Sequence, residues 1–169
     1  HVFYIIKENR SYDQLFGDLP QGDGDSTLCL FGERVTPNHH AIANEFVLLD
    51  HTYCESDGSA DGHNWGMGAY ATDYVIKGES ANRIYDFEGG NPLAFPSGGY
   101  LWDLCARHGV SYRSYGEFVQ NPKKLGDPST ARLKSLQGRF DPFYHGFDMD
   151  YPDVKRAERF ISELKRFEG

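Results

Sequence analysis

Two groups of polar side chains in this sequence have the types and surroundings that metal-assisted chemistry needs. The first is Glu8-Asn9, which follows an apolar run over residues 2–6. A carboxylate and an amide oxygen are ligands that hard divalent cations take. The second is Ser59, which precedes a helical pattern and would lie where the helix N-terminus stabilises a phosphate. The ordinary interpretation of Glu8-Asn9 is a solvated loop, and that of Ser59 is a helix N-cap.

The elements expected to position these groups are strands of a parallel sheet. Residues 2–6 and 46–50 are apolar runs, each of which ends at a polar or acidic residue, and residues 110–115 alternate in polarity. Runs of this kind are typical of strands buried on both faces by helices. Ligands of such sheets bind beyond the carboxyl ends of the strands, which is where Glu8 and Asn9 would lie. The sequence therefore predicts an α/β fold, with a mostly parallel sheet covered by helices on both faces.

Helical patterns occur between and after these runs. A helix from about 60 to 76 is expected from aromatic and small apolar residues at helical spacing, and a second helix ends at Gly109. The last helix opens near Pro152 and carries an apolar stripe that needs a partner surface. A short helix is expected after Thr36-Pro37-Asn38, and residues 78–99 and 116–150 are expected to be irregular.

Composition excludes several classes of protein. A chain of 169 residues with 39% hydrophobic content is long enough for one domain with a core. The formal net charge of -8 argues against nucleic acid as a partner, because no basic run neutralises phosphates. No apolar run is long enough for a transmembrane segment. Cys29, Cys54 and Cys105 lack CxxC spacing, which argues against a zinc knuckle and allows one disulfide at most.

Three stretches of the chain together carry a resemblance to a known family. They are Lys7-Glu8-Asn9-Arg10-Ser11-Tyr12-Asp13 with Phe16-Gly17, then Val35-Thr36-Pro37-Asn38-His39-His40, then Ser59-Ala60-Asp61-Gly62-His63-Asn64-Trp65. This set resembles the phosphoesterase family of bacterial non-specific phospholipases C and a secreted acid phosphatase, within the alkaline phosphatase superfamily. The resemblance implies a three-layer α/β/α core, a divalent metal ion at the strand ends, a phosphoryl-enzyme intermediate, and secretion or periplasmic residence.

The resemblance also implies roles for individual residues. Glu8 and Asn9 correspond to metal ligands, and Ser59 corresponds to the nucleophile, which also touches the metal. Asn64 and His63 would contact the phosphate or its leaving group. Ser56 is the second candidate nucleophile, because the spacing in this loop differs from the hydroxyl-x-Pro-Asn pattern that is more usual in the family.

The end of the chain departs from the family pattern. The family completes its metal site with ligands in Asn-Asp-His and Glu-Asp-Asp motifs, and neither motif occurs here; His145, Asp148 and Asp150 do not match them. We therefore expect residues 1–169 to be the N-terminal portion of one catalytic domain with an incomplete alkaline-phosphatase-like core, whose missing C-terminal half is its partner.

The expected activity follows from the same resemblance. It is hydrolysis of a small phosphate ester or a phospholipid head group, as a phosphomonoesterase or a phospholipase C-like enzyme, with this piece nearly inactive alone. The alternative is a non-catalytic binding or structural module that uses the same fold.

Overall fold

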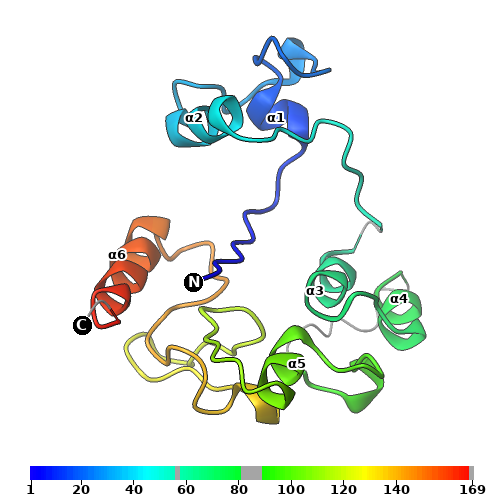
Figure 1. The fold of residues 1–169 in the computed structure, drawn as a ribbon, viewed down its shortest axis with the longest axis vertical. Helices are drawn as coiled ribbons and strands as arrows, with labels where there is room; N and C mark the ends of the chain where they lie inside the picture. The colour runs from blue at the N-terminus through cyan, green and yellow to red at the C-terminus, as the bar shows by residue number, and fades with distance from the viewer. Residues whose placement is uncertain (56–57, 81–88, 168–169) are drawn as a thin grey trace. The chain divides into compact units, whose positions relative to one another are not determined.

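The computed structural model describes residues 1–55, 58–80 and 89–167, and the chain divides into two compact units, His1–Cys54 and Glu55–Gly169 (Figure 1). Each unit is described by itself. The regular elements in the described ranges are helices, and the only strand-like pairings there are two isolated bridges in the second unit.

The first unit is built from short helices around a small centre. Pro37 opens its longest helix, where the fixed φ of proline suits the first turn and its missing N–H costs nothing. Gly17, Leu19, His40 and Ala43 are its buried residues among those described. The elements are α1 (Tyr12–Phe16), η1 (Ser26–Leu28) and α2 (Pro37–Glu45).

The second unit contains the remaining helices and both bridges. Ser114 pairs with Phe140 in parallel, and Gln120 pairs with Thr130 in the antiparallel sense. The helical elements are α3 (Ser59–Gly68), α4 (Asp73–Ser80), η2 (Pro92–Ala94), α5 (Leu101–Arg107), η3 (Lys134–Leu136) and α6 (Asp153–Leu164).

An aromatic cluster forms the core of the second unit. The ring centroid of Tyr100 lies 5.3 Å from that of Trp102 and 4.8 Å from that of Phe118, and Trp102 lies 5.0 Å from Phe118. Met67 of α3 packs into the same cluster. Ala60, at the other end of α3, belongs to a second cluster that includes Val75 of α4. Both clusters therefore fix the position of α3.

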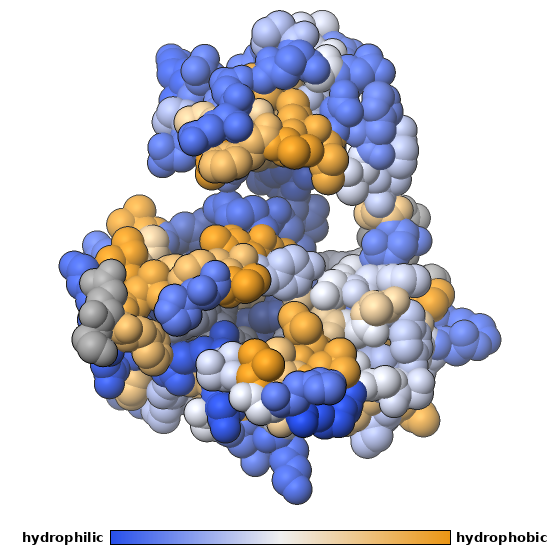
Figure 2. Space-filling model, viewed as in Figure 1, coloured by the Kyte–Doolittle hydropathy of each residue, from blue (hydrophilic) through white to orange (hydrophobic). Residues whose placement is uncertain are grey.

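The predicted parallel sheet is wrong for the described residues. The runs 2–6 and 46–50, expected to be buried strands, are assigned to no strand, and Val2 is 95% exposed and Val47 84% exposed. Apolar residues gather on the surface of the first unit (Figure 2). The physical reason is that a strand is stabilised by ladder hydrogen bonds to a neighbour, which neither run has in a sheet here. The predicted strand over 110–115 contributes only the bridge at Ser114.

The helix predictions fared better. The expected helices after Thr36, before Gly109 and after Pro152 are confirmed as α2, α5 and α6. Gly109 has φ +66°, a conformation that glycine adopts without steric cost. The single helix expected over 60–76 is wrong, because Ala69 adopts the left-handed conformation (φ 63°) and ends α3 before α4 begins.

The last helix is attached through ion pairs on its polar face and through one ring of its apolar stripe, Phe160, whose centroid lies 4.8 Å from that of Tyr115. Arg159 donates to both carboxylate oxygens of Asp141, at 2.6 and 2.7 Å, and Arg113 binds Glu163. Val154 of the stripe is 67% exposed. Most of the predicted stripe is therefore exposed, and ion pairs together with the Phe160 ring hold α6 to the rest of its unit.

The helix lengths and the cysteines give two further facts about the kind of protein. None of the helices in the described residues combines the length and the apolar content that crossing a bilayer requires. Cys29, Cys54 and Cys105 are free thiols.

Candidate functional site

Ser59 is the first residue of α3, following the N-cap Gly58. Its side chain is partly buried, and its hydroxyl makes no hydrogen bond to the residues that the structure describes. The N-terminal turn of an α-helix directs backbone N–H groups and the positive end of the dipole outward, which favours an anion. The position of Ser59 is therefore chemically suited to a hydroxyl that meets a phosphate.

His63 lies one turn after Ser59 on α3, and residues four apart share a helix face. Its Nδ1 is 2.8 Å from Oε1 of Glu117, and the two side chains are 12% and 22% exposed. A carboxylate on one ring nitrogen fixes the orientation and the tautomer of an imidazole. Glu117 therefore positions His63 on the face of α3 that carries Ser59.

Glu117 is the site residue that the sequence did not single out. The contact joins residues 54 positions apart, and Glu117 comes from the irregular segment between the two bridges. Its backbone carbonyl accepts a hydrogen bond of 2.7 Å from the hydroxyl of Ser114, which fixes the loop locally. No periodicity or motif marks an acid in such a segment, so the sequence carried no signal for this pairing.

Asn64 is fully buried, and its amide is engaged on both sides. Nδ2 donates to the carbonyl of Ala60 at 2.8 Å, and Oδ1 accepts from the hydroxyl of Tyr100 at 2.9 Å. In this geometry Asn64 ties α3 to the aromatic core. Its expected contact with phosphate stays a prediction.

Glu8 and Asn9 lie in the first unit, in the irregular segment before α1, and both are exposed. The structure thus brings Ser59, His63 and Asn64 together on one helix and keeps Glu8 beside Asn9 in the other unit. Ser56, the second candidate nucleophile, lies outside the described residues.

A complete metal site is not present among these side chains. In the part of the chain that the structure describes, no group of three or more His, Cys, Asp or Glu residues could hold a metal ion. Hard cations take six to eight oxygen ligands or retain water in their place. Glu8 and Asn9 supply two such ligands, so the residues described here do not by themselves fit a tightly bound metal.

The largest pKa shifts lie away from Ser59 and have structural causes. The hydrogen bond from His40 lowers the pKa of Asp18 to about 2. Burial, together with the carboxylate of Glu163, raises the pKa of Tyr115 to about 12. Perturbed pKa values can mark functional sites, but here Asp18 pairs with His40 of α2, and Tyr115 contacts Glu163 of α6, so both shifts have structural causes.

No protein-family model, curated protein sequence or solved structure matches the chain. The sequence motifs and the geometry of α3 are therefore the features of this chain that bear on its function.

Proposed function

We propose that this chain provides part of a metal-dependent phosphoric ester hydrolase in which Ser59 forms a phosphoryl-enzyme intermediate. The observation that supports this most is the arrangement on α3. A partly buried serine occupies the first position of a helix of 10 residues, and His63, one turn later, is held by Glu117 at 2.8 Å.

The chemistry assigned to these residues is a two-step transfer. The Ser59 oxygen attacks phosphorus and loses its proton, the bond from phosphorus to the ester oxygen breaks, and the alcohol leaves with a proton. Backbone N–H groups at the start of α3 stabilise charge on the phosphoryl oxygens. Water then attacks the phosphoserine and releases inorganic phosphate when the substrate is a monoester, or the phosphorylated head group when it is a phospholipid.

His63 is assigned a contact with the transferring group. Side chains four apart on a helix have Cβ atoms about 5–6 Å apart, so the ring stands beside any group bound to the Ser59 oxygen. Glu117 keeps that ring from rotating away. The substrate is a small phosphate ester or a phospholipid head group; a monoester would make the activity that of a phosphomonoesterase, and a phospholipid diester would make it phospholipase C-like.

The proposed metal ligands in the first unit are Glu8 and Asn9. Because the described residues contain no group of three potential His, Cys, Asp or Glu ligands, a cation bound here would keep most of its water and bind weakly. We therefore expect these 169 residues alone to hydrolyse an aryl phosphate at close to the uncatalysed rate.

The second candidate is a non-catalytic binding or structural module. It is favoured by the same incomplete ligand set and by the engagement of Asn64 with Tyr100. A module of this kind would bind a phosphate group at α3 without forming a covalent bond to Ser59.

The test is covalent trapping rather than turnover. The protein is incubated with p-nitrophenyl phosphate and Mn²⁺ or Zn²⁺, and digested peptides are analysed by mass spectrometry for a phosphoryl group. We expect slow modification of Ser59 and none in Ser59→Ala, whereas Ser111→Ala, an exposed serine of the same unit, behaves as wild type.

The peptide map also separates Ser59 from Ser56. Modification of Ser56 alone would move the nucleophile to that residue. Phosphate binding without modification of either serine would favour the binding module, and rapid turnover would contradict the expected weak activity.

A further inference from the structure

A cavity of about 210 Å³ lies in the second unit, and none of the residues assigned to phosphoryl transfer lines it. A cavity of about 150 Å³ in an engineered protein holds benzene, so this one has room for a single substituted ring. Its lining residues come from three stretches of the chain: Pro122, Leu125, Gly126, Asp127, Ser129, Pro142, Phe143, His145 and Tyr151.

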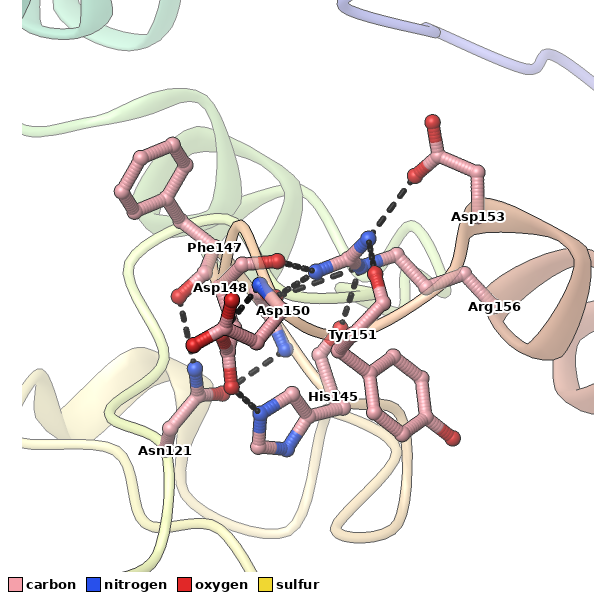
Figure 3. A network of polar contacts seen from close by, with 9 residues as sticks. Asn121, His145, Phe147, Asp148, Asp150, Tyr151, Asp153 and Arg156 are labelled. Atoms are coloured by element: carbon pink, nitrogen blue, oxygen red, sulfur yellow. Dashed lines mark hydrogen bonds and ion pairs between the residues drawn. The ribbon is translucent and has the colours of Figure 1, made fainter.

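His145 supplies a buried polar group to this cavity. Its side chain is only 8% exposed, and its Nε2 is 2.8 Å from Oδ2 of Asp148. The other ring nitrogen, Nδ1, makes no hydrogen bond to a described residue and lies on the side of the ring away from Asp148 (Figure 3). Nδ1 is not one of the buried polar atoms that lack a hydrogen-bond partner, so part of its surface is accessible.

The tautomer of His145 follows from its partner. A carboxylate only accepts hydrogen bonds, so Nε2 carries the proton in the bond to Asp148. In the neutral ring Nδ1 is then an acceptor with a lone pair. Among the residues that line the cavity, His145 therefore offers one acceptor, and its contact with Asp148 fixes its orientation.

The loop that carries His145 is held from two sides (Figure 3). Asn121 accepts a hydrogen bond of 2.7 Å from the Gly146 amide and donates one of 2.9 Å to the Phe147 carbonyl. Arg156 of α6 reaches the loop from the other side. Its guanidinium donates to the carbonyls of His145, Gly146, Asp148 and Tyr151 and to the carboxylate of Asp153.

These contacts make the cavity wall rigid before any ligand arrives. The Tyr151 ring is 4.5 Å from the His145 ring, and the Arg156 guanidinium lies 5.3 Å from the centre of the Tyr151 ring. A site whose side chains are locked by a supporting shell loses little conformational entropy on binding. The arrangement around Arg156 is that kind of support.

The lining determines which ligand chemistry fits. Pro122, Pro142 and Phe143 offer flat apolar surfaces, and the polar groups are His145 Nδ1, the Asp127 carboxylate and the Ser129 hydroxyl. Two of these are acceptors, and no lysine or arginine is among the residues that line the cavity. A phosphate or another anion would meet acceptors and a carboxylate, because the nearby guanidiniums of Arg156 and Arg159, which stack on the rings of Tyr151 and Phe143, are already paired with Asp153 and Asp141.

We propose that this cavity binds a small planar aromatic molecule that carries an O–H or N–H donor, with the donor on Nδ1 of His145 and the ring against Phe143 and the prolines. This site is separate from the proposed phosphoryl-transfer site and does not depend on it. Small phenols and N–H heterocycles share the required chemistry.

Two probes of nearly equal size test the role of the donor. Phenol and toluene are titrated separately into the ¹⁵N-labelled protein at pH 8, and amide shifts are followed by NMR. We expect shifts centred on residues 122–151. We also expect the Kd of phenol to be about fivefold lower than that of toluene, as one neutral hydrogen bond allows.

Two variants locate the interaction. His145→Gln keeps an amide N–H for Asp148 but removes Nδ1. The affinity for phenol should therefore fall about fivefold, to the affinity for toluene. The matched control is His108→Gln, at an exposed histidine after α5, which should change neither affinity. Leu125→Trp, at a lining residue that is 66% exposed, should fill the cavity and abolish binding of both probes even if His145→Gln fails to fold.

Each result decides the proposal. Equal affinities for phenol and toluene in the wild-type protein would overturn it. So would shifts that lie outside residues 122–151, or binding that survives Leu125→Trp.

Discussion

The two units of this chain bury different kinds of residue. The first unit buries His40 against Asp18 and leaves most of its large apolar side chains in solvent, including Phe46 at 67% and Leu49 at 70% exposure. The second unit buries an aromatic cluster in which Phe118 and Leu136 have no exposure. One unit is thus centred on a polar pair and the other on packed rings.

The difference teaches that an apolar run does not make a core by itself. Residues 46–50 are as apolar as the residues of the second core, yet they have no second layer to pack on in their own unit. A core needs at least two layers, each covering the apolar face of the other. In the second unit α3, α5 and the loop that carries Phe118 provide such layers.

Loss of an aromatic ring from the second core should have the largest effect. Phe118→Ala removes a side chain with no exposure that contacts Tyr100 and Trp102, so we expect a loss of about 4 kcal/mol in the free energy of unfolding. Urea unfolding followed through the amide resonance of Leu136 measures it. Phe147→Ala, at a ring that is 74% exposed, is the control and should change little. Equal effects of the two changes would contradict the core assignment.

Breaking the ion pair between Arg159 of α6 and Asp141 should lower the free energy of unfolding somewhat less than loss of the Phe118 ring. Arg159→Met leaves the Asp141 carboxylate buried without its guanidinium, which should destabilise the second unit by about 3 kcal/mol. Lys155→Met is the control, because its pair with Glu158 is exposed on both sides. The same urea titration measures both variants, and a loss from Lys155→Met as large as that from Arg159→Met would contradict the difference between buried and exposed pairs.

The Asp141 pair also predicts a pH dependence. Burial alone would raise the pKa of Asp141, but the hydrogen bonds from Arg159 outweigh it and lower the pKa below 3.8. The stabilisation is therefore complete above pH 3.8 and is lost as the pH falls through the lowered pKa. In Arg159→Met burial acts on Asp141 without the guanidinium, so the loss of stability on acidification below pH 3.8 should be smaller than in the wild-type protein, as urea unfolding at pH 5 and pH 3 measures.

Local signals in the sequence predicted the helices well. Pro37 at a helix start and Gly109 after a helix end act through backbone geometry, which depends on a few neighbouring residues. The left-handed Ala69 that divides the helix expected over 60–76 carries no such signal, since glycine or asparagine is the usual residue there.

Long-range pairings were beyond the sequence for a physical reason. Strands need partners that a periodic pattern cannot identify, and the sheet expected from residues 2–6 and 46–50 is not formed. The polar docking of α6 through Arg159 and the contact between Glu117 and His63 join residues far apart. In the candidate site, therefore, the neighbours on α3 were predictable and the carboxylate that orients one of them was not.

The smallest expected effect concerns the polar pair of the first unit. His40 Nε2 lies 2.9 Å from the Asp18 carboxylate and Nδ1 lies 2.9 Å from the Thr36 carbonyl, so both ring nitrogens face acceptors and the ring is favoured in its protonated form. His40→Gln should lower the free energy of unfolding of the first unit by about 1–2 kcal/mol. The effect is small because Asp18 is 35% exposed and solvent weakens the pair. His39→Gln, at the neighbouring and only partly buried histidine, is the matched control.

The pH profile distinguishes this pair from ordinary packing. Burial by itself lowers the pKa of His40, but Asp18 and Thr36 outweigh it and raise the pKa above 6.5, while the pKa of Asp18 falls to about 2. The contribution of His40 is full below pH 6.5 and is lost as the pH rises through its raised pKa, and that of Asp18 is full above pH 3.8 and is lost towards pH 2. Urea unfolding followed at the Ala43 amide should therefore show greatest stability between pH 3.8 and 6.5, and this maximum should flatten in His40→Gln. A maximum that persists in the variant would show that other groups of the first unit produce it, since glutamine cannot titrate.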